Sequence, residues 1–422
     1  MSLLKNYNNT IVACYIGYIV QAIVNNFVPL LFITFQNTYN ISLDRITLLV
    51  TVNFGVQLFV DLLSSKLVDK TGWRIAMIAA HVFAALGLAG LTLLPELFED
   101  AFYGLLLAVV FYAVGGGLLE VCVSPIVEAC PTKRKAAAMS LLHSFYCWGA
   151  VAVILASSLY FLFRGTGDWK VMALIWAAVP ALNCIYFMLV PMPEQEAEAK
   201  SGSFKALFGN KIFWLMALLM ICAGASELCI AQWASSFAES GLGVSKVVGD
   251  IAAPCAFAFL MGVSRLVFAK LSEKVRLEPM LLVSGVLCAG GYLIIALSPN
   301  AVLSLVGCGI CGFAVGAMWP GTFSLSAGGI KGGGTMMFAF LALAGDIGCT
   351  AGPTLVGFVT DALGGELQKG LSFGIIFPVI LCIGLVVFMV INAKNKKKTM
   401  LEASLSETPG VKEEKDNDSI QS

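Results

Sequence analysis

Apolar residues fill the chain in long runs, and short polar stretches separate one run from the next. A helix needs about 20 apolar residues to cross a hydrocarbon core about 30 Å thick. The runs reach that length, whereas a β-barrel would show alternating segments of about ten residues. We therefore expect an all-α polytopic membrane protein with twelve transmembrane helices. The expected spans cover residues 10–35, 46–66, 74–95, 102–127, 137–162, 170–191, 212–236, 248–269, 279–298, 301–326, 335–361 and 371–393.

One interior polar stretch is longer than the others, and it divides the spans into two groups of six. We expect residues 1–191 and 212–393 to form two six-helix bundles joined by a cytoplasmic linker loop at 192–211. After the last span the chain is lysine-rich, then acidic, and it has no apolar period. Such a composition predicts a disordered cytoplasmic tail at 394–422.

Lysine and arginine residues gather in alternate loops, and positively charged loops stay on the cytoplasmic side. We therefore expect both termini in the cytoplasm. The compact loops favour a bacterial cytoplasmic membrane as the plasma membrane that holds the chain. The expected inner loops contain Lys66, Lys70, Arg74, Lys133, Arg134, Lys135, Lys270, Lys274 and Arg276, whereas the outer loops contain only Arg45, Arg164, Lys170, Lys246 and Lys369.

Composition narrows the class of protein. The chain is 59% hydrophobic and 12% charged, so a soluble form would expose large apolar patches. Its formal net charge is zero, so nucleic acid is not an expected partner. Most of the 13 cysteines stand singly in apolar runs, and the one pair, Cys308 and Cys311, has no second pair at zinc-site spacing. We expect no metal and no cofactor.

The fourth span combines close packing with a charge. Gly115, Gly116 and Gly117 let a neighbouring backbone come close, and Glu120 follows them on the same helix. A charge in hydrocarbon is costly and usually functional, so we expect Glu120 to line a polar cavity. Glu120 and His143 both lie about 10 Å from the cytoplasmic end of their helices, so the two could form a proton relay. Alternatively, His143 bonds a backbone carbonyl and Glu120 braces a helix.

A second group of polar and aromatic residues suits a hydroxylated solute. Acids and amides bind paired hydroxyl groups, and an aromatic ring can cover the C–H face of a sugar. For Trp233 the alternative is an anchor at the membrane interface. The residues that could form this substrate site are Asn25, Asn26, Glu227, Gln232 and Trp233.

Two further spans carry candidate residues. In the tenth, Trp319 precedes Pro320 and Gly321, and broken helices mark binding regions in transporters. A packing kink is the alternative. In the eleventh, Asp346 lies near mid-membrane among small residues, where it faces the cavity or makes a polar structural contact.

Acids outnumber bases within the spans. Asp61, Glu120, Glu227 and Asp346 face a single permanent base, Arg265. At least one acid therefore lacks a fixed cation, and desolvation favours its neutral form. Such a group can take up a proton on one side and release it on the other, which predicts proton coupling.

The two halves resemble each other, as in transporters built from related bundles. A shift of 204 residues aligns 66–70 with 270–274 and places Asp61 opposite Arg265. Residues 65–74 resemble the loop motif of the major facilitator superfamily, Gly-x-x-x-Asp-Arg/Lys-x-Gly-x-Arg/Lys. The matching residues are Asp69, Lys70, Gly72 and Arg74, Ser65 replaces the first glycine, and 269–276 is a degraded second copy with Glu273.

This resemblance implies the major facilitator fold, with two pseudo-symmetric six-helix bundles. We expect Asp61 and Arg265 to join the motif residues Asp69, Lys70, Arg74 and Glu273 in salt bridges that close the cytoplasmic side. The alternative is that the bases there extend to water.

Within the superfamily, residues 115–125 and 224–233 are most similar to fucose-permease-like sugar:proton symporters. Those relatives carry a helix-four glutamate used in proton coupling, which Glu120 matches. They also carry a helix-one aspartate, where this chain offers Gln21, Asn25 and Asn26. That detail of coupling does not carry over.

These patterns predict a secondary active transporter that takes up a small polar solute, such as a sugar, with protons. Its partners would be the solute, protons and the lipid bilayer, and we expect a monomer. The alternative is a proton-coupled efflux antiporter for drugs. The many phenylalanines favour it, but residues 143–149 lack the Gly-Pro motif that it predicts. An intramembrane enzyme would need a nucleophile–base pair or metal ligands, and the only histidines are His81 and His143.

Overall fold

The computed structural model describes residues 6–132, 135–193, 204–272, 274–330 and 334–406. Helices account for nearly all of these residues, and the described part of the chain contains no strand. Within these described ranges, twelve helices or broken helices are long and apolar enough to cross a membrane. The twelve expected spans and the all-α class are therefore confirmed, and the protein is a multi-pass membrane protein.

The first half of the chain begins with a broken helix, because Pro29 interrupts the first span with a 3-10 turn. The helices that follow run unbroken through their spans. The elements are α1 (Tyr7–Asn26), the 3-10 turn Val28–Leu31, α2 (Phe32–Tyr39), α3 (Leu43–Thr71), α4 (Trp73–Leu97), α5 (Ala101–Ala129), α6 (Lys135–Arg164), the 3-10 turn Thr166–Asp168 and α7 (Trp169–Leu189).

The second half contains more irregular helices. Two π-helical turns, Phe237–Gly241 and Ile251–Cys255, flank the short helix α10. The helices are α8 (Phe204–Phe208), α9 (Lys211–Ser236), α10 (Lys246–Asp250), α11 (Ala256–Leu271), α12 (Leu277–Leu297), α13 (Ala301–Val315), α14 (Met318–Gly329), α15 (Gly334–Ala362), α16 (Leu367–Phe373) and α17 (Ile376–Ser406).

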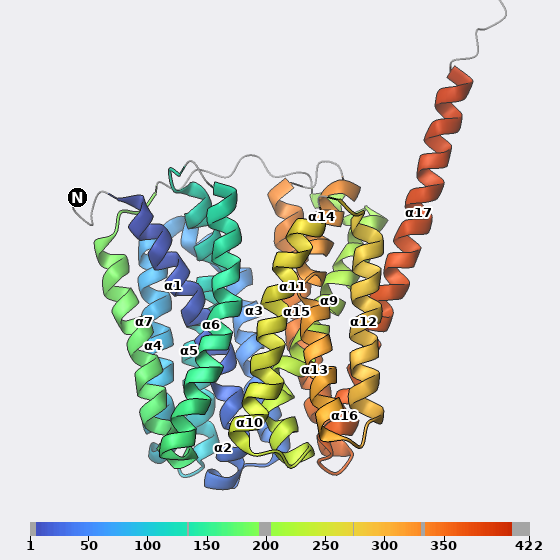
Figure 1. Ribbon diagram of the computed structural model, residues 1–422. Helices are drawn as coiled ribbons and strands as arrows, with labels where there is room; N and C mark the ends of the chain where they lie inside the picture. Colours follow the sequence, from blue (N-terminus) through green and yellow to red (C-terminus); the bar gives the residue numbers. More distant parts are fainter. Residues whose placement is uncertain (1–5, 133–134, 194–203, 273, 331–333, 407–422) are drawn as a thin grey trace, which may run out of the picture.

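Figure 1 shows the helices standing side by side, with α1 to α7 on one side and α9 to α17 on the other. Within the first side α4 packs on α5 and α7, and within the second α12 packs on α13 and α17. Helices α1 and α9 begin at the same end of the molecule, which we name the linker end. The short helices α2, α10 and α16 lie at the opposite end (Figure 1).

The tail differs from its prediction. We expected disorder over 394–422, but α17 continues as a helix to Ser406. Lysine, methionine, leucine, glutamate and alanine are good helix formers, and a helix already nucleated in the membrane extends at low cost. The prediction is therefore wrong for 394–406, while 407–422 lie outside the described residues.

The glycine triplet of α5 allows three close helix contacts, as predicted. A Cβ atom on Gly115 would lie 2.5 Å from the carbonyl oxygen of Ala80 in α4. One on Gly116 would lie 3.1 Å from Oε1 of Gln21 in α1, and one on Gly117 would lie 2.8 Å from Cβ of Val60 in α3. Larger residues would separate these helices, so the triplet fixes the wall on which Glu120 stands.

The tenth span breaks one turn before the predicted motif. Helix α13 ends at Val315, and α14 begins at Met318. Pro320 has no N–H to donate to the carbonyl four residues earlier, at Gly316, so the hydrogen-bond ladder is interrupted there. The break brings Trp319 into the space between the two halves.

Candidate functional site

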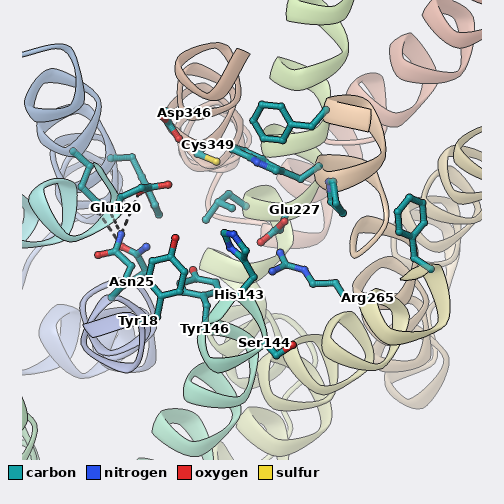
Figure 2. Close-up of a pocket in the computed structure, with 18 of the residues that line it drawn as sticks. Tyr18, Asn25, Glu120, His143, Ser144, Tyr146, Glu227, Arg265, Asp346 and Cys349 are labelled. Carbon is teal, nitrogen blue, oxygen red and sulfur yellow. Dashed lines mark hydrogen bonds between the residues drawn. The ribbon is translucent and has the colours of Figure 1, made fainter. Parts of the chain in front are cut away.

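A cavity of about 480 Å³ lies between the two halves of the chain. Ligand sites for small molecules have volumes of this order. Figure 2 shows that its walls combine charged, amide and aromatic side chains. The first half contributes Tyr18, Gln21, Asn25, Phe54, Gln57, Glu120, His143, Ser144 and Tyr146, and the second half contributes Glu227, Leu228, Arg265, Leu266, Phe268, Trp319, Pro320, Phe323, Asp346 and Cys349.

Buried amides hold Glu120 in place. Gln21 Nε2 donates to Glu120 Oε2 at 3.3 Å and to Gln57 Oε1 at 2.9 Å. Gln57 Nε2 in turn donates to Asn25 Oδ1 at 3.0 Å. This chain of hydrogen bonds links α1, α3 and α5, so the orientation of Glu120 depends on residues of three helices.

Three carboxyl groups meet at this wall. Oxygens of Asp61, Glu120 and Asp346 all lie within 4.8 Å of one another. Asp61 and Glu120 belong to the first half of the chain, and Asp346 comes from α15 of the second. Carboxylates this close cannot all be ionised without strong repulsion, so the cluster favours holding a proton. The structure thus brings two predicted proton-coupling residues, Glu120 and Asp346, to Asp61, which we had expected only at the gate.

His143 shares the cavity with Glu120, but the predicted relay is not formed directly. The His143 ring lies against the ring of Tyr18, with centroids 5.6 Å apart. Among the described residues no hydrogen bond joins His143 to Glu120. The proton-coupling role of His143 stays a prediction.

Glu227 and Arg265 line the same region of the cavity from α9 and α11 (Figure 2). Glu227 is 9% exposed, and Arg265 Nε is buried without a hydrogen-bond partner. We had expected Arg265 in a cytoplasmic gate with Asp69 and Glu273. Its guanidinium instead faces the cavity, beside Glu227 (Figure 2). The side chains of Asp69 and Glu273 lie outside the described residues, so that gate stays a prediction.

Among the described residues, Arg74 contacts its own half of the molecule and Lys70 forms no ion pair across to the other half. Arg74 donates to the carbonyl oxygens of Phe187, Met188 and Val190 at 2.8, 3.0 and 2.9 Å. It therefore caps the carboxyl end of α7 within its own half of the molecule, as cations do at helix C-termini. Lys70 is exposed.

Three of the predicted substrate residues lie away from the main cavity. Trp233 is fully buried, donates to the Pro353 carbonyl at 2.9 Å and packs against the Phe32 ring. Asn26 donates to the carbonyl of Ala22, four residues earlier. Gln232 donates to the backbone oxygen of Asn25 at 3.0 Å and so joins the two halves. Asn25, Glu227 and Trp319 do line the cavity.

Gln57 was not predicted as a site residue, although the sequence contains a pattern that indicates it. Gln57 lines the cavity and follows Asn53 by four residues in the second expected span. Residues four apart share one face of a helix, so the pair marked the polar face of α3. Tyr18 and Tyr146 also line the cavity, but tyrosines within apolar spans carry no comparable signal.

Side chains of the two halves form hydrogen bonds with each other toward the end opposite the linker end. There Thr51 Oγ1 of α3 lies 2.7 Å from Thr354 Oγ1 of α15. Ser158 of α6 donates to Oδ2 of the buried Asp250 at 3.0 Å. The charged cavity residues lie on the linker side of these contacts, so the cavity is closed at its far end.

Comparison with known proteins gives the same architecture. A family model described as Major Facilitator Superfamily matches residues 14–353. The membrane protein MosC of Rhizobium meliloti is 22% identical over 286 residues, which are 67% of this chain and 68% of that relative.

Several solved structures share the fold. The E. coli fucose:proton symporter FucP is 17% identical, with a TM-score of 0.63, over 91% of this chain and 99% of that chain. A D-xylose-proton symporter is 12% identical, with a TM-score of 0.75, over 90% and 97%. A bacterial homologue of the human lysosomal transporter Spinster, inward-facing and unoccupied, is 16% identical, with a TM-score of 0.73, over 91% and 97%. At these identities the likeness is one of fold alone.

Proposed function

The chain belongs to the major facilitator superfamily, and from this premise we propose that it couples the uptake of a small polar solute to the movement of protons. The observation that carries the proposal is the cavity between the halves, with Glu120 in its wall and Asp61 and Asp346 beside it. The two bundles rock about this cavity and open it to each side in turn.

The carboxyl cluster supports proton coupling. Asp61 and Glu120 belong to one half and Asp346 to the other, so their separation changes when the halves move. A proton held by the cluster in one state is released more readily when the carboxyl groups separate. Protonation and the position of the bundles are therefore linked.

The remaining wall supports a hydroxylated solute such as a sugar. Asn25, Gln57, Tyr18 and Tyr146 offer amide and hydroxyl groups, and Trp319 offers an aromatic face. Two proteins of similar fold are named as fucose and D-xylose proton symporters, which supports the same class of solute.

We place both termini and the linker end in the cytoplasm of a bacterial cell, with the chain acting as a monomer. With this orientation the closed end of the cavity faces outward. The cavity then represents the state from which an imported solute leaves toward the cytoplasm.

Proton movement tests the function directly. Purified protein is placed in liposomes that contain a pH-sensitive dye, and sugars and sugar acids are added outside one at a time. We expect one solute to acidify the interior, and Glu120→Gln to abolish the signal. Glu128→Gln, an exposed position on the same helix, is the matched control and should behave as the unchanged protein. A flat trace with every solute, from protein shown to be folded, would contradict the proposal.

A second function has one specific observation in its favour. Phe268, Trp319 and Phe323 give the cavity an apolar wall on the second half of the chain, which suits amphipathic drugs. In that case cationic dyes loaded into the liposomes would leave as protons enter, and no sugar or sugar acid would move.

A further inference from the structure

Arg265 carries a fixed positive charge in the cavity, and Glu227, which faces the same space, forms no ion pair with it at 4.0 Å or less. A guanidinium group stays protonated in proteins. Arg265 Nε is buried without a hydrogen-bond partner, and within the described parts of the chain no carboxylate forms an ion pair with Arg265 at 4.0 Å or less. An uncompensated charge in a poorly solvated place is costly, and the half-buried Arg265 side chain can relieve this cost by binding an anion that enters the cavity.

The other arginines of the described chain are all satisfied, although most of them lie at the surface. Arg74 has three backbone carbonyls at the end of α7. The remaining three pair with carboxylates: Arg45 with Asp100, Arg164 with Asp168, and Arg276 with Glu278. The one arginine in the cavity is thus the one that lacks a partner, which is the reverse of what packing alone would favour.

We infer that the solute is an anion with one carboxylate group, and that Arg265 is its counter-ion. The inference rests on the proposed transport function and specifies the solute of that same cavity. The guanidinium fork matches the two oxygens of a carboxylate in geometry and charge. Tyr18, Tyr146 and Asn25 lie in the same cavity and can bind hydroxyl groups, so a hydroxylated acid such as a sugar acid fits both features.

The charges around Arg265 limit the anion to a single negative charge. Glu227 of α9 faces the same space (Figure 2), and a phosphate dianion would meet strong repulsion there. The other titratable groups that line this region are His143 and Tyr146 of α6 and Tyr18 of α1. The other acids of the cavity, Glu120 and Asp346, lie beside Asp61, where mutual repulsion disfavours ionisation of all three carboxyl groups.

A cationic solute is the opposite possibility, because carboxyl groups outnumber bases around the cavity. It would have to bind beside Asp61, Glu120 and Asp346, where Gln21 already donates a hydrogen bond to Glu120. It would also leave Arg265 unpaired in the loaded state. An anionic solute would neutralise the charge of Arg265, whereas a cationic solute would add a second positive charge to the cavity.

Matched solute pairs test the inference. Binding and uptake of D-glucuronate are compared with those of D-glucose, and D-gluconate with D-glucitol, in the reconstituted protein. We expect the acid of a pair to bind and its neutral partner to bind weakly. Arg265→Gln should weaken the acid at least about thirtyfold, and Arg265→Lys, which keeps the charge, should weaken it less. Arg276→Gln is the control, since the Arg276 side chain is 79% exposed.

Each result supports or overturns the inference that Arg265 binds an anionic solute. If the neutral partners bind better, or if Arg265→Gln leaves the acids unaffected, the anion inference is overturned. The proton-coupled function still stands in that case, provided that a neutral solute gives a proton signal that Glu120→Gln removes. If neither acid binds to protein shown to be folded by its thermal unfolding, the inference is overturned as well. The preference of the unchanged protein needs no variant, so a misfolded Arg265→Gln would not leave the question open.

Discussion

At the scale of single residues, the hydrogen bonds among the amides of Gln21, Gln57 and Asn25 hold Glu120 in place. Gln57→Leu removes the acceptor of Gln21 and a donor to Asn25, and these buried groups would lose about 1–3 kcal/mol of stabilisation. Glu120 would also lose its fixed orientation, so we expect a lower unfolding midpoint and weaker solute-driven proton uptake.

Another buried amide supplies the control for Gln57. Asn183 donates to the Ala13 carbonyl at 3.0 Å and is not among the residues that line the cavity. Asn183→Leu should lower the unfolding midpoint to a similar extent and leave proton uptake per folded molecule unchanged. Equal losses of uptake in both variants would show that the effect comes from stability alone.

A substitution of Arg74 distinguishes a structural role of this residue from a role in the cytoplasmic gate. Arg74→Met removes three hydrogen bonds at the end of α7, and bonds to charged groups contribute about 1.5–3 kcal/mol each at most. We expect a lower unfolding midpoint and unchanged transport by the molecules that remain folded. An unchanged midpoint with lost transport would instead support the predicted gate.

Asp100, in the loop between α4 and α5, gives a dependence of stability on pH. A hydrogen bond from Arg45 lowers the pKa of Asp100 below its ordinary value. The ionised form therefore stabilises the folded protein above the unfolded pKa of about 3.9, and this contribution disappears as the pH falls through the lower folded value. Between about pH 6 and about pH 3 the unfolding midpoint should fall more steeply in the unchanged protein than in Asp100→Asn. Parallel curves would contradict this.

At the scale of helices, close packing at the glycine triplet can be measured. Gly117→Ala would place a Cβ atom 2.8 Å from Cβ of Val60, which forces α3 and α5 apart. We expect a loss of about 1–3 kcal/mol, together with weaker coupling because Asp61 and Glu120 stand on these two helices. Gly290 of α12 has open space around it, so Gly290→Ala should be neutral or stabilise by up to about 1 kcal/mol.

The positions of the helices along the chain were predictable from the sequence, but the directions of their side chains were not. Length and hydropathy determine the spans, so all twelve were predictable. Rotation about the helix axis was not predictable. Trp233 follows Glu227 by six residues, and at about 100° per residue it points to a different face of α9, where it packs against Phe32.

Packing between helices was also hidden from the sequence. Arg265 and Asp61 occupy matching positions in the two halves, which suggested matching roles in a gate. In the structure Asp61 meets Glu120 and Asp346, whereas Arg265 faces the cavity beside Glu227. Which helices meet, and at what angle, depends on contacts between segments far apart in the chain. Hydropathy along one segment carries no information about them.

At the scale of the whole molecule, the two halves are held together at the end opposite the linker end. Thr51 contacts Thr354, Ser158 contacts Asp250, and Gln232 contacts the backbone of Asn25. Each of these contacts joins a helix of one half to a helix of the other. Transport by alternating access requires that all of them break together, while the cavity closes on the linker side.

A reversible cross-link at this end tests that requirement. The hydroxyl oxygens of Thr51 and Thr354 lie 2.7 Å apart, so cysteines at both positions fall within reach of a disulfide bond. Oxidation of Thr51→Cys/Thr354→Cys should hold the far end closed and stop solute uptake, and a reductant should restore it. Solute binding from the linker side should survive oxidation, because the cavity lies on that side of the link. Each single variant, oxidised in the same way, controls for the 13 native cysteines. Uptake at the unchanged rate in the cross-linked protein would mean that the far end does not open during transport, and the rocking of the two halves would have to be abandoned.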